Sequence, residues 1–183
     1  MPIRRAACFI AMAALLAACS KSESSTKGDA APAAAASAAP AEGTPNSTIH
    51  LVVTGGPNAG TYDAQATSGG CSYGLAGTNA WGNQFSIDTN DPKAFSSLQL
   101  IVPNSKAAAG GTEHFRMTVG FGPIMGMTSY DIDTRTDAGK PQGKGKLTVD
   151  DRGGSGKVTF SAETAEGVKL DGTIDCHTVM RVS

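Results

Sequence analysis

Short turn signals divide most of the chain into segments that are too brief to form long helices. They are paired glycines, or Asn and Asp followed by proline, at Gly55-Gly56, Gly69-Gly70, Asn90-Asp91-Pro92, Gly110-Gly111 and Gly153-Gly154. The segments between them are rich in β-branched and aromatic residues, and no window keeps the apolar spacing of a helix. The sequence therefore predicts an all-β domain: an antiparallel β-sandwich or a barrel-like meander of about eight to ten strands.

Alternating apolar residues predict how two of these strands pair. Residues 115–121 and 130–133 are expected to form a hairpin, in which the facing pairs are Val119 with Tyr130, Met117 with Ile132 and Arg116 with Asp133. The apolar pairs then share one face and the opposite charges share the other, which is favourable on both faces.

The same reasoning predicts three consecutive strands near the C-terminus. Their expected facing pairs are Leu147 with Phe160, Val149 with Val158, Phe160 with Leu170 and Ala162 with Val168. The last of these strands keeps its apolar residues on one parity as far as Cys176. Cys176 is therefore expected to point into the core.

A second cysteine has the same expected orientation. Cys71 shares its parity with Tyr73 and Leu75, so it should also point inward. Two inward cysteines in an oxidising compartment predict a Cys71–Cys176 disulfide. Closing a loop of roughly a hundred residues would contribute at most about 4.7 kcal/mol in the chain-entropy model.

The N-terminus has the order of a secretory signal. Two arginines precede an apolar run that is short for a membrane span and that ends in small residues. The segment Leu16-Ala17-Ala18-Cys19 resembles the lipobox of bacterial lipoproteins. The resemblance implies that residues 1–18 are a lipoprotein signal peptide and that acylated Cys19 anchors the chain in a lipid bilayer. Ser20 after the cysteine implies, by the same resemblance, an outer-membrane location in the cell envelope, with the domain in the periplasm or at the cell surface.

A tether is expected between this anchor and the folded domain. Residues 19–47 consist mainly of Ser, Ala, Lys, Gly and Pro, and they contain no large apolar side chain, which predicts disorder. Such a tether would span roughly 30 Å r.m.s., and the β-sandwich domain would occupy residues 48–183. Lipobox, tether and Gly-rich β domain together resemble the architecture of small mycobacterial lipoprotein antigens, which implies surface display and host recognition.

The charge balance and the motifs of the chain limit the classes of function that it can have. The chain has 15 Lys and Arg against 16 Asp and Glu, a balance that argues against the basic surface of a nucleic-acid binder. It fits an envelope protein or a glycan as partner. The chain has no Gly-x-Ser-x-Gly motif, and its three histidines are isolated in sequence, so we predict neither an enzyme nor a cofactor.

The methionines and histidines suggest copper as the most specific candidate for a bound metal. Soft thioether and imidazole ligands suited to Cu(I) are available at Met117, Met125, Met127, Met180, His114 and His177. The predicted hairpin already assigns Met117 to the core, however, which weakens this cluster. The acidic segments near Asp88 and Asp131 do not match the twelve-residue calcium loop, so no metal is predicted.

Two segments are candidate contacts for a ligand or partner. Trp81 could stack on a sugar ring or peptide with amides beside it, at Asn79, Asn83 and Gln84; the other interpretation is a core tryptophan. The loop that contains Ile124 and Met125 has an apolar tip, which either folds back as a plug or contacts a partner.

These features predict a membrane-anchored, non-catalytic lipoprotein that acts as a binding or interaction module in the cell envelope. The alternative is a lipoprotein that binds a small ligand, a glycan or peptide, or a soft metal.

Overall fold

The computed structural model describes residues 44–135 and 139–182. The expected signal peptide, Cys19 and nearly all of the expected tether lie outside these residues. Eleven strands and one helical turn form in the described part of the chain, in the order β1 (Ser47–Thr54), β2 (Gly60–Ala66), β3 (Gly70–Tyr73), β4 (Trp81–Ser86), β5 (Phe95–Val102), α1 (Ser105–Ala108), β6 (Arg116–Phe121), β7 (Thr128–Asp133), β8 (Lys144–Asp151), β9 (Gly156–Glu163), β10 (Lys169–Cys176) and β11 (Val179–Arg181). No helix in the described residues has the length and apolar character needed to cross a membrane.

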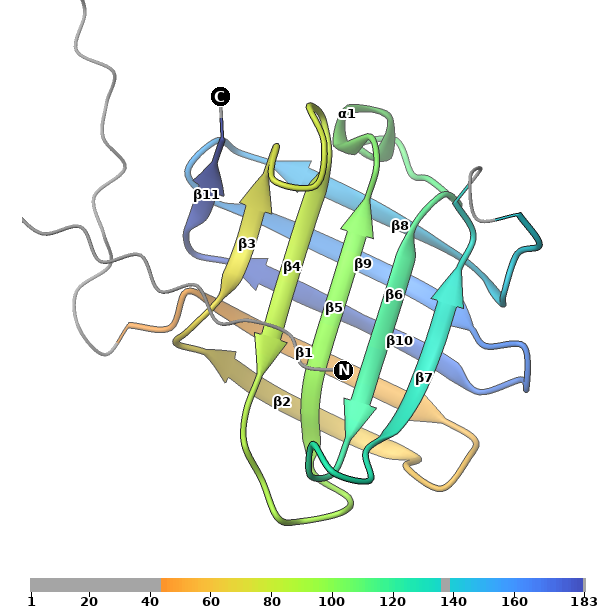
Figure 1. Cartoon of the computed structure of the whole chain (residues 1–183). Helices are drawn as coiled ribbons and strands as arrows, with labels where there is room; N and C mark the ends of the chain where they lie inside the picture. The colour runs from red at the N-terminus through yellow and green to blue at the C-terminus, as the bar shows by residue number, and fades with distance from the viewer. Residues whose placement is uncertain (1–43, 136–138, 183) are drawn as a thin grey trace, which may run out of the picture. The chain divides into compact units, whose positions relative to one another are not determined.

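The strands form two sheets, which confirms the all-β prediction. One sheet has the order β2-β1-β10-β9-β8, and the other has the order β11-β3-β4-β5-β6-β7. Neighbouring strands are antiparallel except for β11 and β3, which pair in parallel. Figure 1 shows the two sheets stacked face to face, with the strands of one crossing those of the other at a steep angle. The fold is thus a two-layer sandwich, and it has one strand more than the expected range because the short β11 follows Cys176.

The core lies between the sheets and follows from strand alternation. In β1, for example, Ser47, Ile49, Leu51 and Val53 are buried while the residues between them are partly or fully exposed. Aromatic rings form a cluster across the two layers: Tyr62 of β2 packs against Phe95 and Phe121, with ring centroids 6.2 and 4.9 Å apart. Such pairs add specific geometry to a large buried apolar area.

The predicted hairpin register is confirmed. Strands β6 and β7 pair Val119 with Tyr130, Met117 with Ile132 and Arg116 with Asp133. Strands β8 and β9 likewise pair Leu147 with Phe160 and Val149 with Val158. In both hairpins the apolar residues face the core, as their period-two pattern predicted.

The predicted register of β9 with β10 is wrong by two residues. Phe160 faces Gly172, and Ala162 faces Leu170, whereas Val168 lies in the loop before β10. A Cβ atom at Gly172 would lie 2.8 Å from Cζ of Phe160. The phenyl ring therefore covers the one inward position of β10 that has no side chain, which accounts for the observed register.

The predicted disulfide is confirmed, and it joins the two sheets. Cys71 of β3 is bonded to Cys176 of β10, with the Cα atoms 5.9 Å apart and a sequence separation of 105. Both cysteines are buried. The parity argument was wrong for Leu75, however, which is 66% exposed because β3 ends at Tyr73.

Glycine in the core has a testable consequence. A Cβ at Gly172 would overlap the backbone oxygen of His50 as well as the Phe160 ring, whereas a Cβ at Gly154 would meet nothing within 4 Å. Gly172→Ala should therefore lower the free energy of unfolding by about 1–3 kcal/mol, the usual cost of overpacking. Gly154→Ala, the matched control, should leave it unchanged or slightly raised. Denaturant unfolding measures both, and equal stability of the two variants would contradict the observed register.

Candidate functional site

Trp81 lies in the core and offers no platform to a ligand. It is the first residue of β4, it is fully buried, and its ring packs across the sandwich against Gly156 of β9. Among the described residues its indole Nε1 has no hydrogen-bond partner. Of the two interpretations of this tryptophan, the structure matches the core residue.

The amides near Trp81 do not converge on one site. The Oδ1 atom of Asn79 accepts a hydrogen bond of 3.1 Å from the Tyr73 hydroxyl. Asn83 is buried, and its Nδ2 donates to Sγ of Cys71 at 3.2 Å. Gln84 alone among the three is exposed, on the outer face of the six-stranded sheet. Asn79 and Asn83 therefore support the local structure, and Gln84 is available for binding.

A groove of about 530 Å³ crosses β11, β3, β4 and β5 on this outer face. None of the residues that line it is charged. One cross-strand row contains Met180, Ser72, Gly82 and Ile101, each opposite the next on the neighbouring strand. Leu75 and Met180 expose 66% and 63% of their surface at the rim. We refer to the six-stranded sheet as sheet B and to this feature as the sheet-B groove.

Gly82 forms the floor of the sheet-B groove. It is flanked by Ser72 on β3 and Ile101 on β5. A Cβ atom there would lie 2.9 Å from the Oγ of Ser72, and the nearest other atom would be 3.7 Å away. A side chain at this position would therefore rise into the groove without meeting the core.

Two amides form the next row of the groove. Gln84 of β4 lies directly opposite Gln99 of β5, and both line the cavity. Primary amides both donate and accept hydrogen bonds, and they carry no charge. The groove thus combines an apolar rim with neutral hydrogen-bonding groups, as binding clefts for neutral ligands do.

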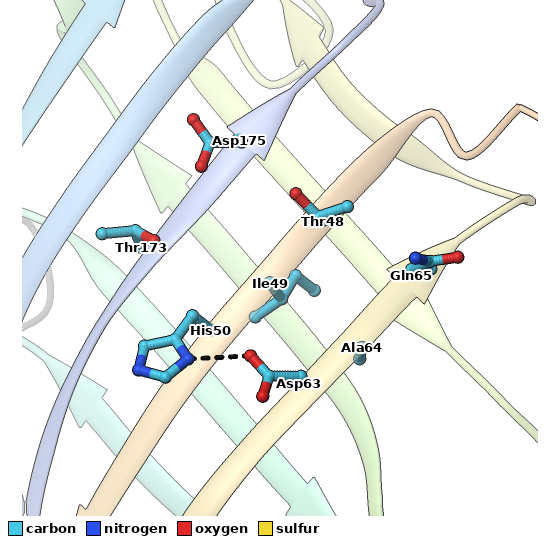
Figure 2. Close-up of a pocket in the computed structure, with 8 residues that line it drawn as sticks. All are labelled: Thr48, Ile49, His50, Asp63, Ala64, Gln65, Thr173 and Asp175. Carbon is cyan, nitrogen blue, oxygen red and sulfur yellow. Dashed lines mark hydrogen bonds and ion pairs between the residues drawn. The ribbon is translucent and has the colours of Figure 1, made fainter.

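The outer face of the other sheet has a different character. A depression there contains His50 of β1, whose Nδ1 lies 2.8 Å from Oδ1 of Asp63 on β2 (Figure 2). Thr173 of β10 lies opposite His50, so Asp, His and Thr share one cross-strand row. His50 makes no hydrogen bond to the Thr173 hydroxyl within the described residues. The His50–Asp63 pair is solvent-exposed, and within the described residues no hydroxyl group is hydrogen-bonded to its imidazole.

Several charged side chains on this second face form ion pairs. Lys157 pairs with Asp175, and Lys144 pairs with Glu163, each at 3.3 Å. Exposed ion pairs of this kind contribute little to stability and keep a surface solvated. The face is therefore charged and hydrated, in contrast to the sheet-B groove.

The loop between β6 and β7 contains the other predicted contact residues. Ile124 and Met125 are 72% and 90% exposed at its tip. Met127 folds back over Gly120, with Sδ 3.4 Å from the Oγ of Ser97. The exposed tip does not match the plug alternative, because a plug would bury these side chains.

The methionines proposed as soft-metal ligands are not brought together. Met117 is buried between the sheets, Met125 is at a loop tip, and Met180 is on β11. In residues 44–135 and 139–182, no group of three or more His, Cys, Asp or Glu side chains could hold a metal ion.

Comparison with known proteins found no matching family model, no matching curated protein and no matching solved structure. The geometry of the described residues therefore carries the functional argument.

Of the residues that line the sheet-B groove, sequence reasoning named Asn83 and Gln84 as ligand contacts and missed the others in that role. The alternation of residues 95–102 contains a usable signal, since Ser97, Gln99 and Ile101 share the parity opposite to the apolar Leu98, Leu100 and Val102. Met180 could not be placed, because the pattern gave no sign of a further strand after Cys176.

The position of Trp81 can be checked by fluorescence. Since it is the only tryptophan of the chain, its emission reports on this site alone. We expect iodide not to quench the native protein, because the ring is fully buried, and to quench it after unfolding. Quenching in the native state would place the ring at the surface.

Proposed function

We propose that this chain is an outer-membrane lipoprotein, held in the bilayer by acylated Cys19, whose β-sandwich is a non-catalytic binding module for a protein partner. The sheet-B groove is its binding surface, and the ligand is an uncharged segment of the partner chain with an apolar side chain.

One observation carries this proposal: in the described part of the chain, an uncharged groove with an apolar rim crosses four adjacent strands of the six-stranded sheet. An apolar side chain of a partner would occupy the space above Gly82, between Met180 and Ile101. Gln84 and Gln99 would hydrogen-bond to its backbone N–H and C=O groups. A charged ligand would find no opposite charge in the groove to offset its desolvation.

A peptide fits the groove better than a glycan. The glycan alternative relied on Trp81 as a stacking surface, but this ring is fully buried. No aromatic residue lines the sheet-B groove, so it has no ring on which a sugar could stack. The near balance of 15 basic and 16 acidic residues likewise supports a protein rather than a polyanion as partner.

The groove can be tested with a photo-crosslinking amino acid placed at Met180 of the full-length protein in its own cells. The control carries the same group at Thr159, on the outer face of the other sheet. We expect a discrete protein adduct from position 180 only. We also expect Gly82→Gln to abolish it, because the added side chain fills the groove floor.

The outcomes separate the alternatives. An adduct at position 180 that survives Gly82→Gln would mean that the partner does not enter the groove. Equal adducts at both positions would indicate non-specific proximity, and no adduct at position 180 would contradict a protein partner at this surface.

The anchor has its own test with a matched control. Cys19→Ala should move the protein from the membrane fraction to a soluble or unprocessed form, because acylation needs that thiol. Cys8→Ala, which changes a cysteine inside the expected signal peptide, should leave the protein in the membrane fraction. Fractionation of cells followed by immunoblotting measures both, and membrane retention of processed Cys19→Ala protein would refute the anchor.

A further inference from the structure

The β6–β7 loop presents an apolar tip that the proposed binding groove does not use. From Gly120 to Met127 the sequence has no charged side chain and no side-chain hydroxyl or amide. Ile124 and Met125 are 72% and 90% exposed. Exposing two adjacent large apolar side chains at a protruding tip is unfavourable in water, so the tip points to an apolar environment.

The base of the loop holds the tip away from the sandwich. Phe121 is fully buried at the end of β6, and Met127 lies over Gly120 against Ser97. The N–H of Gly122 donates a hydrogen bond of 2.9 Å to the carbonyl of Ala94, in the loop before β5. Both ends of the loop are therefore attached to the six-stranded sheet, and Ile124 and Met125 stand out between them.

The tip and the groove rim lie at opposite ends of the same sheet. The loop follows Phe121, which pairs with Phe95 at the start of β5. Leu75 belongs to the loop before Trp81, which pairs with Val102 at the other end of β5. Figure 1 shows the β3–β4 and β6–β7 loops at opposite ends of the strands. A surface that contacts the tip would thus leave the Leu75 end of the groove facing away.

The chemistry of the two ends differs. The groove is concave and has amides that can bond a peptide backbone, whereas the loop tip is convex and has only apolar side chains. Ile87, in the loop after β4 at the same end, adds a further exposed apolar side chain. A protruding apolar tip with no side-chain hydrogen-bonding group fits the acyl region of a bilayer, which offers no such groups in return.

We propose that Ile124 and Met125 insert into the lipid surface to which the chain is anchored, and so set the orientation of the domain on the membrane. This inference rests on the proposed lipid anchor. Thr44, the first described residue, is 25 residues from Cys19, a distance along the chain that cannot exceed about 90 Å. Confinement within this radius raises the effective concentration of lipid, so a contact too weak to bind alone becomes effective.

The charges beside the loop tip indicate which lipid headgroup suits the test. The β4–β5 loop at this end contains Asp88, Asp91 and Lys93, so it has a small excess of negative charge. Attraction to anionic headgroups does not contribute, and the insertion depends on apolar contact. Vesicles of zwitterionic phosphatidylcholine are therefore the appropriate probe.

The insertion can be measured with one introduced thiol. The lipidated protein is purified from membranes as Met125→Cys and labelled with an environment-sensitive fluorophore, then reconstituted on these vesicles. Cys19 is acylated in this form, and Cys71 and Cys176 are bonded to each other, so the new thiol takes the label. The matched control is Leu75→Cys, which is exposed at the other end of the sheet. Co-sedimentation first confirms that each protein is on the vesicles.

We expect blue-shifted emission from position 125 that nitroxide groups on the acyl chains quench, and aqueous emission from position 75. Ile124→Asp in the Met125→Cys protein should return the emission to its aqueous value without changing the bound fraction. Aqueous emission at both positions, or insertion at position 75, would overturn the proposal while the anchor stands. Failure to co-sediment would instead overturn the anchor and, with it, this inference.

Discussion

The Cys71–Cys176 disulfide holds together the corner of the sandwich on which the sheet-B groove depends. Cys176 ends β10 in one sheet, and after His177 and Thr178 the chain enters β11 in the other sheet. There β11 pairs in parallel with β3, the strand that contains Cys71. A strand of three residues forms few hydrogen bonds of its own, so it needs support from elsewhere. The cross-link supplies that support, because it attaches the end of β10 to the strand on which β11 lies.

Other contacts at this corner act on the same short segment. The N–H groups of His177 and Thr178 both donate to the carbonyl of Asn46, just before β1. The guanidinium of Arg181 lies 4.7 Å above the centre of the Tyr73 ring and pairs with Asp151 of β8. The chain that changes sheets is therefore tied to both of them. These contacts therefore fix the position of Met180, which forms one wall of the groove.

The strand pattern was predictable from sequence, and the exceptions have physical causes. Period-two alternation correctly placed Cys71 and Cys176 in the core and set the β6–β7 register, because each shift by one residue would expose the apolar face. Alternation cannot distinguish shifts by two residues, which keep the same face inward. The β9–β10 register depended instead on Phe160, whose ring needs the empty position at Gly172.

The structural role of glycine was the hardest to predict from the sequence. In the sequence it appears as a turn former, yet Gly145, Gly156 and Gly172 lie on strands at inward positions. Each has an aromatic ring above it, from Phe115, Trp81 and Phe160 respectively. Which aromatic residue covers which glycine is a tertiary property, so the burial of Trp81 could be offered only as one of two interpretations. The same applies to Gly82, where an absent side chain faces outward and leaves a groove.

The two outer faces of the sandwich differ in the charge that they expose. On the five-stranded sheet, exposed positions hold ion pairs and threonines, which keep that face hydrated. On the six-stranded sheet, the outward-facing charged residues lie on β6 and β7, at Arg116, Asp131 and Asp133, where Arg116 and Asp133 face each other across the strands. Strands β11, β3, β4 and β5 have none facing outward. A surface without charge over four adjacent strands does not raise the solubility of the protein, and its apolar rim lowers that solubility. Covering this surface with a neutral partner, as we propose, would remove its apolar rim from water.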